Sequence, residues 1–525
     1  MARLFVAVLS LWASLSQGAA QSATYSNPVI PGDHPDPSLT RIGGEFWATS
    51  TSSAWAPVFP LLHSRDLVNW DLAGAVFDQA PQWSAGNYWA PEISYFKGRV
   101  YLYYTARRRG GPLCVAVATA DRPAGPYTDH GPMICEDVGS IDPVTAVDEK
   151  GDRYLIWKRD GNSQKQPTPI QIQKLSEDGT TLVGAKTELI RNDEPWEGQL
   201  VEGPFVLHRN GWFYLFYSAA GCCGVKCDYR VGVARARHLL GPYEKYAKNP
   251  ILSSNQRWVC PGHGSVTVDV QGREFFLYHA YDPKNSIFVG RQGLLDRVEW
   301  TPDEWPVIDG GEGPSIDAQL PFPSQPPAET ASVFDDNFRG KKLRPEWQWP
   351  WDQPPTVSFG DGSGGCLELA PRGSRASDRV GAVLAIEPLT GDYHATVQLD
   401  PHGLRDDDWA GLTAYGDENN ALGIALHQKS ITVWRRRAAK DATTATTARP
   451  PGSAVYLKMQ VSGGDQYTFA YSGDGTHWTA LNESLSGDYL PPWDLATRIA
   501  ISAGGSSSTR ARFASFRVQY AQTPH

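Results

Sequence analysis

One hydrophobic pattern recurs five times in the first half of the chain. Each copy has a glycine and then, within six residues, two or more aromatic residues interleaved with aliphatic ones. The five glycines are Gly44, Gly98, Gly151, Gly211 and Gly272. A repeat of roughly 50–60 residues with short strands and glycine turns is typical of one four-stranded propeller blade. We therefore predict a five-bladed β-propeller. The alternative is a large β-sandwich in which the spacing is coincidental.

The same register selects one residue in each repeat. Nine residues before the repeat glycine, or eight in the first repeat, the chain carries Asp36, Trp89, Asp142, Glu202 and His263. The innermost strand of each propeller blade lines the central channel, so equivalent positions form a ring around the axis. The pattern thus predicts that three carboxylates, one tryptophan and one histidine converge on a single funnel.

The three acids lie in similar local sequences, since each is next to proline or glycine: Asp36 and Asp142 precede proline, and Glu202 precedes Gly203. A single acid in such a place is most simply a turn residue, but three at matching register favour a shared site. Crowded carboxylates have pKa values that spread apart, so that one serves as an acid and another as a base. Hydrolysis of a glycosidic bond needs this pair.

The hydrophobic pattern changes after Trp305. A proline-rich stretch at 318–331 predicts a stiff linker. Residues 332–525 contain short alternating segments that end at Gly, Asp or Asn turns, which predicts a β-sandwich. The fold class is therefore all-β, with a propeller at 21–317 followed by a sandwich.

Composition narrows the class of partner. The net charge of -9 gives no basic surface for nucleic acid or anionic membrane, and 19 tryptophans among 525 residues offer many flat faces for sugar rings. We expect no nucleic-acid partner, no membrane partner and a monomer.

The first twenty residues predict the compartment. A positive Arg3, an apolar run and a small-residue end at Gly18–Ala20 are typical of a cleaved signal peptide at 1–20, so we expect a secreted protein. The seven cysteines fit that route. The cluster Cys222, Cys223 and Cys227 raises zinc as an alternative, but no histidine is near it in sequence, and we favour disulfides.

Several segments together resemble glycoside hydrolase family 43, over roughly residues 25–315. The segments, in order, are 27–38 with Asp36-Pro-Ser, 63–70, 88–92 with Trp89-Ala-Pro-Glu, Ser140-Ile-Asp142-Pro, Glu202-Gly-Pro204 and Gly290-Arg291-Gln292. The resemblance implies a five-bladed propeller that hydrolyses arabinose- and xylose-containing plant polysaccharides with inversion. Residues 332–525 resemble the concanavalin-like domain behind many of its members.

The resemblance also implies roles for the acids. Asp36 matches the general base that activates water, and Glu202 matches the general acid that protonates the leaving oxygen. Asp142 matches the residue that tunes the pKa of the acid and orients it. Arg291 matches an arginine that contacts the sugar, with a surface arginine as the alternative.

The remaining candidates are aromatic or histidine residues. Trp89 and Trp55 are expected to wall the sugar pocket, with core packing as the alternative for Trp55. His263 matches a histidine that helps to hold a central ion through waters, so a structural Ca²⁺ is expected there, with a hydrogen-bonded structural histidine as the alternative. The chemistry itself requires no cofactor. Asp33, close to Asp36, is interpreted as a loop residue.

An α-L-arabinofuranosidase acting on arabinoxylan is the leading hypothesis for function. A β-xylosidase is close behind, and an endo-arabinanase is less favoured. The non-enzyme alternative is a secreted lectin whose funnel binds sugar without turnover.

Overall fold

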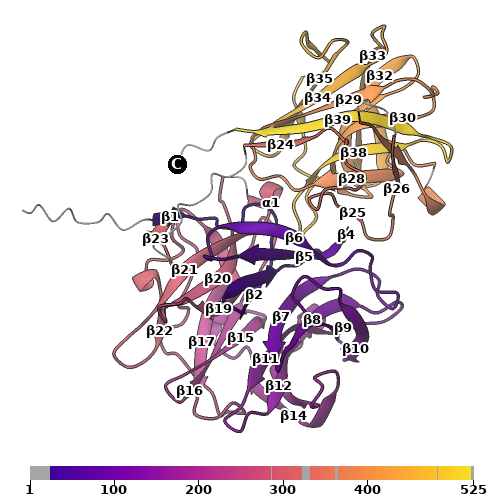
Figure 1. The fold of residues 1–525 in the computed structure, drawn as a ribbon. Helices are drawn as coiled ribbons and strands as arrows, with labels where there is room; N and C mark the ends of the chain where they lie inside the picture. The colour runs from indigo at the N-terminus through magenta and orange to yellow at the C-terminus, as the bar shows by residue number, and fades with distance from the viewer. Residues whose placement is uncertain are drawn as a thin grey trace, which may run out of the picture.

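The computed structural model describes residues 24–284, 286–321, 332–360, 365–375, 377–481 and 483–521. The predicted signal peptide and most of the predicted linker lie outside the described residues. The described chain is built almost entirely of strands, in two β-structured halves that contact each other (Figure 1).

The first half contains five antiparallel four-stranded sheets, each made of strands close together in sequence. The sheets are β2–β3–β5–β6 (Ser38–Ile42, Glu45–Thr49, Val58–Ser64, Trp70–Phe77), β7–β8–β9–β10 (Trp89–Phe96, Arg99–Arg107, Leu113–Ala120, Thr128–Ile134), β11–β12–β13–β14 (Ser140–Val147, Arg153–Arg159, Ile170–Leu175, Leu182–Ile190), β15–β16–β17–β18 (Val201–Arg209, Trp212–Ala219, Arg230–Ala236, Glu244–Lys245) and β19–β20–β21–β22 (Val259–Val268, Glu274–Tyr281, Gln292–Trp300, Pro306–Ile308).

The first strands of these sheets form a ring. Strand β2 contacts β7, β7 contacts β11, β11 contacts β15, β15 contacts β19, and β19 returns to β2. Figure 1 shows these inner strands around the middle of the lower half, with the other strands of each sheet outside them. Each sheet is therefore a blade, and the arrangement is that of a β-propeller.

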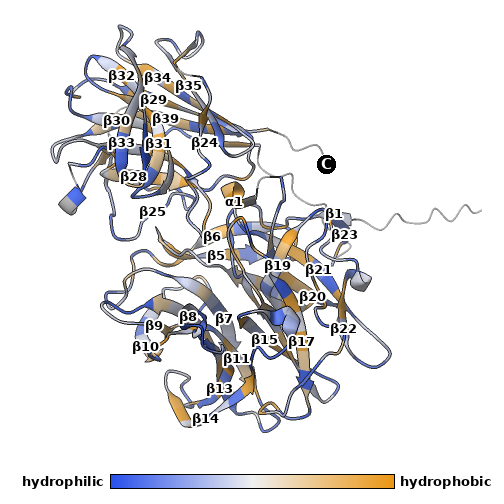
Figure 2. Ribbon diagram, turned by 180° about the vertical axis from the view of Figure 1, so that it is seen from behind, coloured by the Kyte–Doolittle hydropathy of each residue, from blue (hydrophilic) through white to orange (hydrophobic). Residues whose placement is uncertain are grey.

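The aromatic residues of the sequence repeat form the cores between neighbouring blades. Tyr214 and Phe216 of β16, for example, are buried against Phe276 and Tyr278 of β20. Burying an aromatic side chain stabilises the fold by roughly 1.5–3 kcal/mol, so the repeat that marks the blades also holds them together. In Figure 2 the hydrophobic segments, in orange, run along the strands of both halves.

The inner strands share local distortions near the register residues: a positive φ in all five repeats and a β-bulge in four of the strands. β-Bulges interrupt β7 after Trp89, β11 after Ile141, β15 after Glu202 and β19 around His263. A residue with positive φ lies at or just after the register position in each of the five repeats: Asp36 (53°), Ala90 (43°), Asp142 (55°), Gly203 (56°) and His263 (42°). Bulges turn side chains out of the regular alternation of a strand, and here they turn the register residues away from the ladder.

The second half is a sandwich of two antiparallel sheets around one large apolar core. One sheet has the order β26–β27–β39–β29–β34–β35–β36 (Thr356–Phe359, Leu367–Ala370, Ala511–Tyr520, Tyr393–Asp400, Val455–Ser462, Gln466–Ser472, Thr479–Ala480), with β24 (Val333–Asp336) beside β39 and β37 (Leu485–Ser486) beside β35. The other has the order β28–β38–β30–β31–β32–β33 (Ala382–Ile386, Arg498–Gly504, Trp409–Asp417, Asn420–Leu426, Ser430–Arg437, Lys440–Ala448).

Short elements complete the fold. Strand β1 (Thr24–Ser26) pairs with β23 (Asp317–Gln319), and β4 (Trp55–Ala56) of the propeller pairs with β25 (Trp349–Pro350) of the second half. Among the described residues, the helices are α1 (Ser286–Val289) and four 3-10 turns, Asn162–Gln164, Pro195–Glu197, Asp309–Gly311 and Gly373–Arg375. Within the described ranges, no helix has the length and apolar character needed to cross a membrane.

Candidate active site

The three predicted carboxylates lie close together, and two of them lie beside His263. The Nδ1 atom of His263 lies 3.5 Å from Oδ1 of Asp36 and 4.0 Å from Oδ2 of Asp142. Oδ2 of Asp142 in turn accepts a hydrogen bond of 2.9 Å from the backbone N–H of Gly203, directly after Glu202. Three blades therefore supply one buried acidic cluster, and a fourth supplies the histidine beside it.

Asp36 is held in its ionised form. Its Oδ1 accepts a hydrogen bond of 3.0 Å from Arg291, and its Oδ2 accepts one of 2.6 Å from Thr51. Burial alone would raise the pKa of Asp36, but the Arg291 guanidinium, the neighbouring His263 and the Thr51 hydrogen bond hold it well below its usual range. A carboxylate that stays charged in a buried site is suited to accept a proton from water.

The backbone of Asp36 is also fixed. Its N–H donates to Nδ1 of His279, 3.0 Å away, and His279 is fully buried. Burial, followed by the nearby Arg291 charge, lowers the pKa of His279 well below its usual value, so this histidine is neutral and free to accept.

The environment of Asp142 shifts its pKa in the opposite direction from that of Asp36. Burial, together with the negative charges of Glu202 and Asp36, raises the pKa of Asp142 to about 7, against the opposing effects of His263 and Lys158. Asp36 and Asp142 are thus driven apart in acidity although both lie beside His263. This divergence is typical of a site in which carboxyl groups take different roles.

Glu202 is held by two donors. Lys158 Nζ lies 2.6 Å from its Oε2, and the Tyr229 hydroxyl donates to its Oε1 over 3.0 Å. The ring of Tyr229 stacks on His279 with the planes 5° apart. The partners of Glu202 and Asp36 therefore pack directly on each other.

A loop of the second half reaches into this site. Trp89 of β7 is half-buried, and its Nε1 donates to Ser53 and to Asp494 Oδ2 at 2.9 and 3.2 Å. Trp493, 62% exposed, contacts Trp89 edge to face, with ring centroids 5.9 Å apart. The backbone oxygen of Asp494 accepts a hydrogen bond from Arg291. The sandwich therefore supplies part of the wall beside the carboxylates.

Asp33 fixes the next part of that loop. Its Oδ2 accepts hydrogen bonds from Arg498 Nη1 at 3.0 Å and from the Ala496 N–H at 2.8 Å, and its Oδ1 accepts one from the Arg291 N–H at 3.2 Å. Asp33, interpreted from sequence as a loop residue, is a buried anchor between the two halves.

Trp55 lies elsewhere than the sequence predicted. It is only 2% exposed and packs in a cluster with Val383, Tyr415 and Trp434 of the sandwich. Its strand β4 pairs with β25, so its ring is enclosed at the junction of the two halves. The expectation that Trp55 walls the sugar pocket is therefore corrected: the alternative of core packing holds.

Among the residues that the structure describes, those around His263 do not provide the ligands of a metal site. Calcium prefers six to eight oxygen ligands, whereas in the described part of the chain no group of three or more His, Cys, Asp or Glu side chains is arranged to hold a metal ion. His263 and its two carboxylate neighbours therefore do not fit a directly ligated ion. Hydrolysis by two carboxyl groups needs no cofactor.

Six of the seven cysteines form disulfides, as expected, and Cys366 is free. The pairs are Cys114–Cys135, Cys222–Cys223 and Cys227–Cys260. The zinc alternative for the 222–227 cluster is thus wrong, because each of its sulfurs is in a disulfide.

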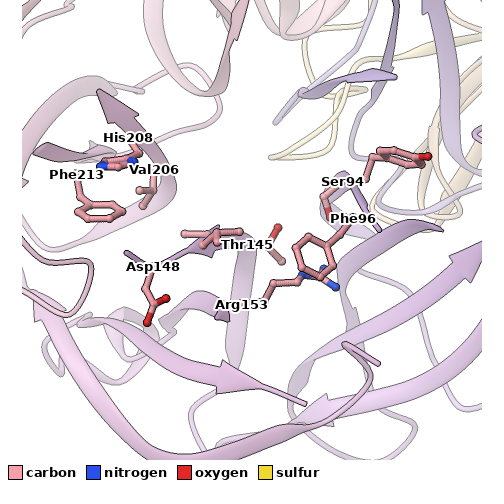
Figure 3. A pocket seen from close by; sticks show the side chains of 11 residues that line it. Ser94, Phe96, Thr145, Asp148, Arg153, Val206, His208 and Phe213 are labelled. Carbon is pink, nitrogen blue, oxygen red and sulfur yellow. The ribbon is translucent and has the colours of Figure 1, made fainter. Parts of the chain in front are cut away.

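A separate cavity of about 320 Å³ lies at the other end of the inner strands. Figure 3 shows Ser94 and Phe96 of β7, Thr145 of β11 and Val206 of β15 around it, with Asp148 and Arg153. This cavity contains none of the three clustered carboxylates. The candidate active site therefore lies at the opposite end of the inner strands.

Fold and site together define a propeller with a buried set of unequally acidic carboxyl groups, as a glycosidase requires. Residues 25–306 match the family model "Glycosyl hydrolases family 43", and residues 335–519 match "Beta xylosidase C-terminal Concanavalin A-like domain". The chain belongs to glycoside hydrolase family 43 and is an inverting O-glycosyl hydrolase.

Individual proteins agree with this assignment. The chain is 27% identical over 436 residues to "Xylosidase/arabinosidase 43B" of Humicola insolens, covering 77% of each chain. It is 28% identical over 343 residues to "Non-reducing end alpha-L-arabinofuranosidase BoGH43B" of Bacteroides ovatus, covering 62% of this chain and 60% of that one. The crystal structure of the GH43 BlXynB protein from Bacillus licheniformis superposes with a TM-score of 0.83 at 26% identity, over 95% of this chain and 100% of that one.

Sequence reasoning missed the residues that hold the acids. Lys158, Thr51, Tyr229 and His279 each contact Asp36 or Glu202. Lys158 immediately follows the aromatic run of the third repeat, and the repeat spacing could have indicated that its strand borders the funnel. The Trp493–Asp494 pair follows two prolines, a signal for an exposed loop that sequence alone cannot assign to a partner surface.

Proposed function

We propose that the protein removes single terminal sugars from plant cell-wall polysaccharide, with α-L-arabinofuranosyl side chains of arabinoxylan as the first candidate. One observation carries the exo-acting part of this proposal. The Trp493–Asp494 loop of the sandwich lies against Trp89 and Arg291, on the rim of the acidic cluster. A wall on that side favours a pocket for one chain end over an open groove.

In this proposal Asp36 is the general base and Glu202 the general acid. The ionised state of Asp36 fits the first role, because only a deprotonated carboxylate can accept a proton from the attacking water. Glu202 would donate its proton to the departing oxygen. Asp142, hydrogen-bonded to the N–H of Gly203, would orient the segment that carries Glu202. Arg291 and Trp89 would contact the sugar or shape its pocket.

The test is to incubate the purified protein with arabinoxylan and identify the released sugars. Free arabinose as the sole early product supports the proposal. Release of oligosaccharides would contradict the exo-acting part, and binding without release from arabinoxylan, arabinan or xylo-oligosaccharides would favour a lectin.

A β-xylosidase is the second candidate, because residues 335–519 match the domain described for β-xylosidases. It predicts that xylose is released from xylo-oligosaccharides faster than arabinose from arabinoxylan. The two candidates share the same carboxyl groups and differ in the shape of the pocket around the terminal sugar.

We also propose that the protein is secreted and monomeric. Three disulfides support secretion, since disulfides persist in oxidising compartments. Mass spectrometry of the mature N-terminus and light scattering of the purified protein test the two statements. We further propose, from the match of His263 to the family's histidine, that this residue holds a calcium ion through waters. Chelation would test this.

A further inference from the structure

Lys158 is a buried cation beside the candidate general acid. It belongs to β12, the second strand of the third blade, and its side chain is 1% exposed. Its Nζ lies 2.6 Å from Oε2 of Glu202 and 2.9 Å from Oδ1 of Asp160. Glu202 comes from the neighbouring blade, so this ion pair joins two blades directly at the site.

This lysine stays charged in its buried position. Burial alone would lower the pKa of Lys158, but the carboxylates of Glu202, Asp160 and Asp142 raise it above its usual value. Burying an ammonium group is costly unless anions compensate it. Two direct carboxylate contacts supply that compensation here.

The chemistry of the two groups restricts where a proton can lie on Glu202. An ammonium group has three donors and no acceptor, so the oxygen that faces it must accept. Oε2 of Glu202 is in that position. The other oxygen, Oε1, faces the Tyr229 hydroxyl at the longer distance of 3.0 Å, and a hydroxyl can rotate to donate or accept. A proton on Glu202 therefore belongs on Oε1.

Given the acid role proposed above for Glu202, on which this inference rests, we propose that Lys158 is a positioning residue for the reaction. It reserves Oε2 as an acceptor, fixes the rotation of the carboxyl group and leaves Oε1 as the oxygen that delivers the proton to the leaving group. Lys158 does not touch the substrate. Its effect is confined to the step in which the leaving oxygen is protonated.

A merely structural ion pair makes a different prediction. If Lys158 only neutralised two acids, its loss would lower the amount of active enzyme and reduce turnover of every substrate by the same factor. If it positions the acid, its loss affects poor leaving groups, which need protonation, more than good ones, which depart as anions.

The experiment compares 4-nitrophenyl and methyl glycosides of the sugar that the wild type releases. For Lys158→Met we expect the ratio of kcat for the good leaving group to kcat for the poor one to rise by at least about tenfold, since general acid catalysis contributes roughly 10²–10⁴-fold. KM should change little. Lys158→Arg, which keeps the charge, should return the ratio towards the wild-type value.

Two reference variants complete the design. Lys174→Met removes a lysine from the next strand of the same blade, where an exposed pair with Asp152 lies away from Glu202, and should keep the wild-type ratio. Glu202→Gln should show the largest rise. If the kcat ratio of Glu202→Gln does not rise above the wild-type value, the proposed acid role of Glu202 fails. If the ratio rises in Glu202→Gln but not in Lys158→Met, only the positioning role of Lys158 fails.

The ratio does not depend on how much protein is folded, because both substrates are measured on one preparation. Where Lys158→Met yields no active enzyme, Lys158→Gln replaces it, since its amide has an acceptor oxygen as well as donors and therefore no longer reserves Oε2 as an acceptor. The same rise is expected, and an unchanged ratio in Lys158→Gln overturns the proposal.

Discussion

Arg291 of the propeller and Asp494 of the sandwich are joined by a hydrogen bond of 3.1 Å from the guanidinium to the backbone oxygen. The same guanidinium lies 3.0 Å from Oδ1 of Asp36. One side chain therefore connects the second half of the chain to the candidate base. The sandwich contributes directly to the site.

The side chain of Asp494 should matter for substrate use. Replacing it in Asp494→Ala removes the acceptor shared by Ser53 and Trp89. A hydrogen bond to a charged group contributes roughly 1.5–3 kcal/mol, so we expect kcat/KM to fall by about tenfold or more. Steady-state kinetics with the 4-nitrophenyl glycoside of the sugar that the wild type releases measures kcat/KM. Asp488→Ala, at an exposed position nearby, is the control, and equal values for both variants would contradict the role of the loop.

Asp33 should hold the two halves together. Its ion pair with Arg498 is buried, and breaking such a pair by removing one partner costs about 3–5 kcal/mol. We expect Asp33→Ala to lower the unfolding temperature markedly and to separate the unfolding of the sandwich from that of the propeller in calorimetry. Arg297→Met, which removes an exposed pair with Glu299, should have little effect. A single unshifted transition in Asp33→Ala would be evidence against a joint anchor.

Asp142 should make stability fall as pH rises. Its pKa is raised from 3.8 to about 7 in the folded protein, so the folded state binds one more proton than the unfolded state between these values. The stabilisation that protonated Asp142 provides is fully present below its pKa in the unfolded state, 3.8, and is lost as the pH rises towards its pKa in the folded state, about 7. Asp142→Asn removes the titration, and its stability relative to wild type should improve by roughly 4 kcal/mol between about pH 4 and pH 8.

Urea unfolding of both proteins across this range measures the difference. Asp71→Asn, at an exposed position of β6, serves as the control. Parallel stability curves for wild type and Asp142→Asn would mean that Asp142 does not titrate in this range.

Chelation should leave the chemistry intact. Because two carboxyl groups suffice for hydrolysis, dialysis against EDTA should change kcat by less than about twofold. A decrease of the unfolding temperature without loss of kcat would indicate a structural ion near His263. Abolished turnover that calcium restores would contradict catalysis by the carboxyl groups alone.

The repeat register predicted a large part of this site because a propeller places equivalent residues in a ring. Asp36, Asp142 and His263 lie in contact for that reason, although bulges interrupt the strands at Asp142 and His263. Aromatic runs after each glycine predicted the strands because blade packing requires them.

The errors have a different cause. Trp55 is enclosed by residues more than 300 positions later in the chain, so no local pattern could separate a pocket wall from a domain junction. Lys158 was missed because a lone lysine in a strand is usually exposed. Its partner Asp160 is close in sequence, but its partner Glu202 comes from the neighbouring blade. The contacts of Asp33 and Trp493 likewise form only where the propeller and the sandwich meet, so the local sequence does not indicate them.

The most direct test of the account is turnover of Asp36→Asn on the substrate from which the wild type releases sugar. We expect kcat to fall by at least about 10³-fold, because an amide cannot take the proton from water, while the circular dichroism spectrum stays that of the folded protein. Turnover near the wild-type rate in the folded variant would contradict Asp36 as the base and, with it, the proposed mechanism.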